Sequence, residues 1–350
     1  MSDVVEVETR TMTFADMRLA HGEMLPELRL AYETCGRLAA DGRNAILVTH
    51  GYTSHHHAGG RYAAGKAPAG ISEPGWWDTL IGPGKPIDTG RYFVVSSNTL
   101  GSSFGSTGPS SLDPRTGRPY GPTFPRITLS DMVAAQKRLL DALGVKRLAA
   151  VAGQSYGGYQ AFQWAVRYPD FLDRIVATVT APKGRGGADL VTDLVADLAR
   201  DPNWNDGWYY DRGGIVETLT RMRIATLKLY GADAALAASV PDAAEREQAI
   251  RKLAEPWAKA FDAHSLVVLR RAAVEFDTTR DLDRIRARVL YVLSTTDKLF
   301  PPTLAPGVMD ALKAAGVDAT YFELQSDKGH LASGQDAAKW APALRAFLQR

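Results

Sequence analysis

The chain has 350 residues, of which 45% are hydrophobic and 23% are charged, and its formal net charge is +2. This length and composition are typical of one large α/β domain or of two ordinary domains. The near balance of charge gives no reason to expect nucleic acid or an anionic membrane as a partner. Cys35 is the single cysteine, which excludes an intramolecular disulfide.

The amino-terminal sequence Met1-Ser2-Asp3 leads into polar and acidic residues. It lacks the basic segment followed by an apolar run that a signal peptide contains. No apolar run approaches the ~20 residues that are needed to cross a bilayer. We therefore expect a cytoplasmic protein.

Short apolar runs bounded by polar residues, glycine or proline predict buried strands of a mostly parallel sheet. An earlier alternating segment, 28–34, predicts an outer antiparallel strand, and 321–324 predicts the last strand. The runs that predict buried strands are Ala45–Thr49, Tyr92–Ser96, Leu148–Ala152, Ile175–Val179 and Val289–Leu293.

Helical patterns alternate with these strands. One predicted helix spans 129–143, with Ser130 able to cap its start and Gly144 its end. Another begins near Gln160 and ends before Pro169, and 337–348 predicts an amphipathic carboxyl-terminal helix.

The segment 184–280 has no strand-like run and is dominated by helical patterns. We interpret it as a helical cap inserted between two strands of a core formed by 1–183 and 281–350. The alternative is that this segment forms a second, independent domain.

The sequence Gly153-Gln154-Ser155-Tyr156-Gly157 fits G-x-S-x-G, and it lies between a predicted strand and a predicted helix. This is the context that a nucleophile elbow requires, because the turn is too sharp for larger neighbours. The motif predicts an α/β-hydrolase fold, a mostly parallel central sheet with helices on both faces and an inserted helical cap. It also predicts Ser155 as the nucleophile of an acyl-transfer reaction.

A serine hydroxyl needs a base, and in this fold the chain order is serine, acid, histidine. Only His264 and His330 follow Ser155. His330 follows the last predicted strand and precedes the carboxyl-terminal helix, so we predict it as the base. Asp297 follows the strand 289–293 directly and is the predicted acid; Asp327, three residues before His330 on one loop, is the less favourable alternative.

The negatively charged intermediate needs backbone N–H donors. One is predicted at Tyr156, directly after the nucleophile, and the other at Tyr52, in the loop that follows the strand 45–49. Both tyrosine side chains are then expected to flank the acyl site.

Three other sequence features resemble ligand-binding motifs, and for each of them we prefer a structural interpretation. Adjacent histidines on an extended loop point in different directions, so His55, His56 and His57 are not predicted to bind a metal. The glycines around Arg185 lack the lysine and spacing of a phosphate loop and favour a hinge into the cap. Arg221 and Arg223 are interpreted as a solvated helix face rather than as an anion site.

Beyond the elbow, several longer stretches resemble the homoserine O-acetyltransferase family, from Leu28 to Trp204 and from Val289 to His330. The most specific are Pro74–Asp78, Ile81–Lys85, Ile87–Phe93, Gly105–Pro109, Thr116–Gly121, Asp131–Val133 and Asp201–Trp204. The resemblance implies the same triad, Ser155, Asp297 and His330, and oxyanion donors at Tyr52 and Tyr156. It also implies a homodimer and a ping-pong reaction with acetyl-CoA or another acyl-CoA as co-substrate, and no bound cofactor.

The sequence departs from the family at positions that recognise substrate. The elbow has Gln154 and Tyr156 where the family usually has glycine and methionine. Val195 stands where an arginine is expected six residues before D-P-x-W, and Leu331 follows the histidine where the family has aspartate. A missing arginine argues against homoserine as the acceptor, because arginine is the natural partner of a carboxylate.

Two enzymatic hypotheses follow. The first is a ping-pong acyltransferase that moves a short acyl group to a hydroxyl acceptor, and the second is an esterase or amidase with the same triad and water as the acceptor. A non-catalytic binding protein predicts a damaged triad, whereas all three residues are present.

Overall fold

The structure, a computed structural model, describes residues 5–349. Its centre is an eight-stranded sheet in the order β12-β11-β10-β9-β4-β8-β3-β2. The strands from β12 to β8 are parallel, and β3 and β2 continue the sheet in antiparallel fashion. The strands are β2 (Arg10–Arg18), β3 (Met24–Cys35), β4 (Ala45–Thr49), β8 (Phe93–Ser97), β9 (Leu148–Gln154), β10 (Arg174–Thr178), β11 (Arg288–Ser294) and β12 (Ala319–Leu324).

Two small sheets lie outside the central one. They pair β1 (Glu6–Val7) with β5 (Arg61–Tyr62), and β6 (Ile81–Gly82) with β7 (Ile87–Asp88).

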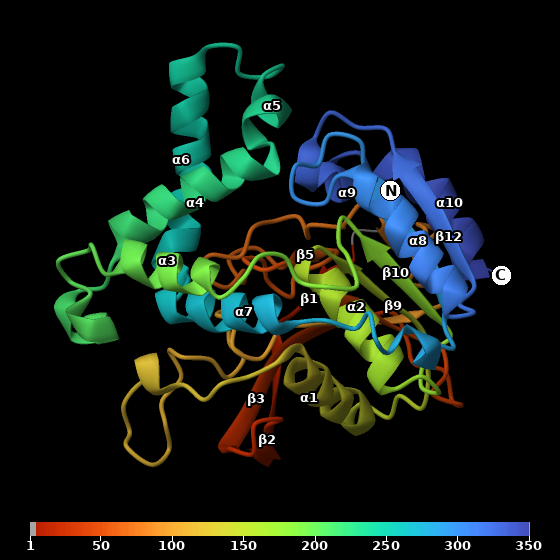
Figure 1. Cartoon of the computed structure of the whole chain (residues 1–350), viewed down its shortest axis with the longest axis horizontal. Helices are drawn as coiled ribbons and strands as arrows, with labels where there is room; N and C mark the ends of the chain where they lie inside the picture. Colours follow the sequence, from red (N-terminus) through yellow and green to blue (C-terminus); the bar gives the residue numbers. More distant parts are fainter. Residues whose placement is uncertain (1–4, 350) are drawn as a thin grey trace.

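Helices cover both faces of the central sheet (Figure 1). Alternate residues of β4 show why: Leu47 packs in one core with α1 and α2, whereas Ile46 packs in another with α10. The helices are α1 (Leu129–Ala142), α2 (Tyr156–Arg167), α3 (Asp189–Leu198), α4 (Val216–Tyr230), α5 (Ala232–Leu236), α6 (Ala243–Ala260), α7 (Ala263–Glu275), α8 (Ala305–Ala314), α9 (Ala332–Gln335) and α10 (Ala337–Gln349). The architecture is that of an α/β hydrolase.

The helices between β10 and β11, α3 to α7, gather at one end of the molecule, away from α8 and α10 (Figure 1). Trp257 and Leu219 belong to a hydrophobic cluster of these helices that Tyr52 of the core also contacts. Leu269 of α7 lies in the main core beside the sheet. The segment 184–280 is therefore anchored on the core through α7. None of the helices within residues 5–349 is long and apolar enough to span a membrane.

The start of α1 differs from the prediction. Thr128, not Ser130, is the N-cap, because its hydroxyl accepts from the backbone N–H of Asp131 while the Asp131 carboxylate accepts from that of Thr128. This reciprocal pair is a capping box. Gly144 ends the helix region with a φ of 83°, as expected for a glycine there.

Gly157 lets α2 pack against β4, and its replacement by alanine is expected to destabilise the protein. A Cβ at this position would lie 2.0 Å from the carbonyl oxygen of Thr49. The backbone has to shift, which costs about 1–3 kcal/mol or more of unfolding free energy. Gly307→Ala on α8 is the matched control, because a Cβ there meets nothing within 4 Å. Denaturant unfolding of both variants measures the effect, and equal stability of Gly157→Ala and the parent would contradict this close approach.

Candidate active site

Ser155 stands on the turn between β9 and α2. Its φ of 55° and ψ of −118° lie where residues other than glycine are rarely found, a strain of about 1–3 kcal/mol. The Ser155 N–H donates to the Thr178 carbonyl at 2.9 Å, and the Thr180 hydroxyl donates to the Ser155 carbonyl at 2.8 Å. The end of β10 thus holds the turn in the strained conformation that exposes the serine side chain at the carboxyl edge of the sheet.

The three residues predicted as nucleophile, base and acid lie in one hydrogen-bonded chain. Nε2 of His330 lies 2.8 Å from Oγ of Ser155, and its Nδ1 lies 2.8 Å from Oδ2 of Asp297. Because a carboxylate only accepts hydrogen bonds, Nδ1 carries the proton and Nε2 accepts from the serine hydroxyl. This geometry fits a serine activated by a histidine that the aspartate orients.

Hydrogen bonds between two loops bring Asp297 and His330 together. The hydroxyls of Thr295 and Thr296, after β11, donate to the carbonyl of Ser326, after β12, at 2.9 and 2.8 Å. The Thr296 hydroxyl also accepts from the N–H of the residue before His330, at 3.0 Å. The second oxygen of Asp297 accepts from the backbone at 2.8 Å, so its carboxylate is fixed at both oxygens.

The alternative acid, Asp327, points elsewhere. Its side chain is 75% exposed and forms an ion pair with the adjacent Lys328 at 3.2 Å. The structure therefore places Asp297, and not Asp327, against the ring of His330.

Tyr52 and Tyr156 line the same cavity as Ser155. Tyr156 opens α2, and Tyr52 lies in the loop after β4; their rings are 5.9 Å apart. The loop comes close to the serine, since a Cβ on Gly51 would lie 3.9 Å from Cβ of Ser155. The side-chain hydroxyls of both tyrosines donate to carbonyls of α7, at Leu266 and Leu269. The helix α7 therefore positions the two residues that were predicted to supply oxyanion donors.

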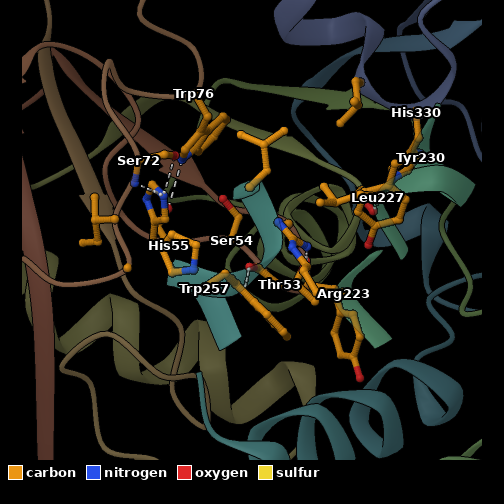
Figure 2. A pocket seen from close by; sticks show the side chains of 18 of the residues that line it. Thr53, Ser54, His55, Ser72, Trp76, Arg223, Leu227, Tyr230, Trp257 and His330 are labelled. Atoms are coloured by element: carbon orange, nitrogen blue, oxygen red, sulfur yellow. Dashed lines mark hydrogen bonds between the residues drawn. The ribbon is translucent and has the colours of Figure 1, made fainter. Parts of the chain in front are cut away.

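A cavity of about 510 Å³ opens beside Ser155 and His330 between the core and the cap. His55, Ser72 and Trp76 gather on one side of it and Tyr230 and His330 on the other, as Figure 2 shows. The His330 ring is packed between Tyr230 of α4 at 4.9 Å and Phe300 at 5.8 Å, centroid to centroid. The cap thus forms part of the wall around His330.

The prediction of a solvated helix face is wrong for Arg223. Its guanidinium lines the cavity, 4.9 Å from the centre of the Trp257 ring, and donates to the Thr53 hydroxyl at 2.6 Å (Figure 2). Burial lowers the pKa of Arg223 to about 10, so that the side chain stays charged at neutral pH. Its Nε is buried and has no partner within residues 5–349. Arg221, two residues earlier, is 56% exposed, as predicted for a solvated helix face, and it pairs with Asp197.

The inference drawn from Val195 also needs correction. Val195 packs among the helices of the cap cluster and is not part of the cavity wall. An arginine is nevertheless present at the site, on α4 instead of α3. Sequence reasoning missed it because a helix of mixed polarity does not reveal which of its faces meets a cavity.

The three adjacent histidines divide between two environments. His55 lines the cavity, with Nε2 3.3 Å from the Ser72 hydroxyl, and burial holds its pKa well below the usual range. Nδ1 of His57 lies 2.9 Å from the buried carboxylate of Glu33, and Nε2 of His56 lies 3.6 Å from it. These contacts with Glu33 anchor the loop that carries Tyr52 to β3. Within residues 5–349 no three His, Cys, Asp or Glu side chains gather in a way that suits a metal.

Comparison with known proteins agrees with this architecture. Residues 44–337 match a family model described as the alpha/beta hydrolase fold. The chain is 37% identical to a homoserine O-acetyltransferase from Solidesulfovibrio magneticus, over 100% of this chain and 94% of that protein. It is 35% identical to a homoserine O-succinyltransferase from Laribacter hongkongensis, over 98% and 96% of the two chains.

The chain belongs to the homoserine O-acyltransferase family of α/β hydrolases. It is accordingly an enzyme, an acyltransferase or a closely related serine hydrolase of this fold. Among solved structures, it is 30% identical to esterase E22 with a TM-score of 0.88, over 98% of this chain and 100% of that one. The proteins that this chain resembles thus include acetyltransferases, succinyltransferases and an esterase.

Proposed function

We propose that this enzyme transfers an acyl group from an acyl-CoA to the hydroxyl of a hydroxy acid through an acyl-Ser155 intermediate. The observation that carries the proposal is the hydrogen-bonded chain of Ser155, His330 and Asp297 on a cavity that also contains Arg223. These three residues supply a nucleophile, a base and its orienting acid, and the partly buried Arg223 supplies a partner for a carboxylate.

Acylation and deacylation use the same groups in opposite order. Ser155 Oγ forms a bond to the acyl carbon while His330 takes the serine proton; the bond from that carbon to the donor's sulfur then breaks, and the proton leaves with the thiol. In the second half, His330 takes the proton of the acceptor hydroxyl and the acceptor oxygen bonds to the acyl carbon. The bond from that carbon to Ser155 Oγ then breaks, and His330 returns the proton to Oγ. The backbone N–H groups of Tyr52 and Tyr156 are the proposed partners of the negative oxygen in both halves.

Arg223 is the proposed partner of the acceptor's carboxylate. The guanidinium faces the cavity that His330 also lines, so an acceptor held there brings its hydroxyl to the base. One hydrogen bond goes to Thr53, which leaves donors free for a planar anion. Arg223 is partly buried, and its Nε has no hydrogen-bond partner within residues 5–349. A cation that is partly removed from water gains from an anionic ligand.

The same cavity disfavours an amino acid as the acceptor. Its wall holds Arg223 and Lys252 and, in the part of the chain that is described, no Asp or Glu side chain. An ammonium group would face two cations and no carboxylate, and Leu331 lies beside His330 where an acid would be needed. A hydroxy acid without an amino group fits these charges better than homoserine does.

Two acceptors of nearly equal shape test this proposal. 4-Hydroxybutyrate is homoserine without its amino group, and with acetyl-CoA as donor it is expected to give ester product at least about tenfold faster than homoserine, as kcat/KM, since charged hydrogen bonds are worth about that much. Arg223→Met is expected to lower kcat/KM for 4-hydroxybutyrate by about tenfold to a hundredfold. Arg221→Met, on the same helix, is the matched control and is expected to keep the parent's rate. Mass spectrometry of the products measures both rates. Faster acylation of homoserine would overturn the choice of acceptor.

Hydrolysis is the second candidate, favoured by the likeness to esterase E22 at 30% identity. It uses the same acyl-enzyme with water in place of the acceptor. If p-nitrophenyl acetate turns over rapidly, and the product is free acetate and not an acetyl ester even when either acceptor is present, the enzyme is a hydrolase.

A further inference from the structure

A second cavity of about 420 Å³ meets the first one at Ser155. Both cavities reach Ser155, Tyr52 and Tyr230, but His330 lines only the first. The second extends along Tyr156 and Tyr159 of α2 towards Phe300 and Leu190. Ser155 therefore stands between two compartments that differ in their access to the base.

Because His330 lines only the first cavity, the two cavities suit different parts of the substrate. The oxygen or sulfur that leaves or attacks the acyl carbon exchanges a proton with Nε2 of His330, so it lies in the first cavity. The carbonyl oxygen points to the loop of Tyr52 and the start of α2. The remaining substituent of the acyl carbon, the acyl chain, is then directed into the second cavity. That cavity is far larger than the methyl group of an acetyl requires.

The walls of the second cavity contain two arginines, Arg185 and Arg270, and no Asp or Glu within the described residues. Arg270, on α7, is partly buried and lies 4.9 Å from the centre of the Tyr52 ring, on the loop proposed to bind the oxyanion. The ionisable groups that act on it are the phenols of tyrosines rather than carboxylates. Arg185 is exposed and lies over the Phe300 ring at 5.6 Å.

We propose that the second cavity binds the acyl chain and that Arg270 binds a carboxylate at the free end of that acyl chain. Ser155 then prefers acyl groups derived from dicarboxylic acids to acetyl and to neutral chains of the same length. This inference rests on the acyl-serine chemistry of the proposed function, and it is independent of the acceptor. The names of the relatives, which include both acetyl- and succinyltransferases, leave this preference open for the present chain.

Two p-nitrophenyl esters of equal length isolate the terminal charge. p-Nitrophenyl hydrogen succinate ends in a carboxylate, and p-nitrophenyl 4-oxopentanoate replaces it with a neutral methyl ketone. Release of nitrophenolate reports acylation of Ser155 whether water or an alcohol then removes the acyl group. We expect the parent enzyme to prefer the succinate ester in kcat/KM by about tenfold or more, the value of a charge-assisted hydrogen bond.

Variants of α7 complete the experiment. Arg270→Met is expected to abolish the preference, and Arg270→Lys to restore part of it. Arg271→Met is the matched control, because Arg271 lies on the same helix and outside the walls of both cavities. A parent enzyme without the preference, or a preference that survives Arg270→Met, would overturn the inference.

Two further outcomes have distinct meanings. If Arg270→Met slows acylation by acetyl-CoA while the two esters react equally in the parent, the arginine binds a phosphate of the donor, and the inference about the acyl chain is wrong. If the parent releases nitrophenolate from these esters and from p-nitrophenyl acetate no faster than Ser155→Ala, the proposed function itself fails.

Discussion

Ser155→Ala is expected to lower kcat for every acyl substrate by about 10⁵- to 10⁶-fold, the loss seen when a serine nucleophile is removed from such a triad. The reason is that the Ser155 hydroxyl lies 2.8 Å from Nε2 of His330, the proposed base, beside the cavity. Without it no covalent acyl-enzyme forms. A stopped assay with p-nitrophenyl acetate measures the rate, and intact-protein mass spectrometry after mixing with acetyl-CoA measures the acyl adduct.

The control for this variant is Ser239→Ala, an exposed serine whose hydroxyl donates to the carbonyl of Leu236 in the cap. It should keep the parent's rate and adduct. Thermal unfolding separates loss of chemistry from loss of fold. Alanine keeps the Cβ of serine, so the backbone strain at position 155 is unchanged and gives no reason for the variant to lose stability. An acyl adduct on Ser155→Ala, or more than about a hundredth of the parent's rate, would show that another residue is the nucleophile.

The strands at the centre of the sheet were predictable because burial on both faces leaves a continuous apolar run. This holds for β4, β9 and β11, all of which were predicted to within a few residues. β2 was not predicted, since it is an edge strand and most of its residues are exposed. Its pairing depends on β3 rather than on its own hydrophobic pattern. The hydrophobic signal of β2 is therefore too weak to reveal it, whereas β12, at the other edge of the sheet, was predicted in part at 321–324.

The residues around Ser155 were predictable for a different reason. The elbow is a contiguous sequence motif that can be recognised without the fold. The positions after β11 and β12 follow from the order of elements along the chain, so the sequence is enough to predict Asp297 and His330. Arg223 could not, because its role depends on how α4 lies over the core. The same is true of Arg270 on α7. The two arginines that we propose to bind substrate both lie in the cap, whose packing the sequence does not reveal.

Asp297→Asn is expected to lower kcat by about 10⁴-fold while leaving the fold intact. The amide keeps the shape of the carboxylate, and its oxygen can still accept the backbone N–H that now bonds to Oδ1. Its NH₂ group then faces Nδ1 of His330, where it donates instead of accepting. The imidazole is driven to the tautomer with its proton on Nε2, which is unable to take the proton of Ser155.

Asp327→Asn separates this effect from a general change of charge near the base. Asp327 lies on the same loop as His330 but forms an exposed ion pair with Lys328, so its replacement is expected to change kcat by less than about twofold. The pH profile adds a second readout, because a wrong tautomer lowers the rate across the whole neutral range and a lost surface charge does not. A large loss in Asp327→Asn together with a small one in Asp297→Asn would mean that the acid on the β12 loop, and not the one after β11, orients the histidine during catalysis.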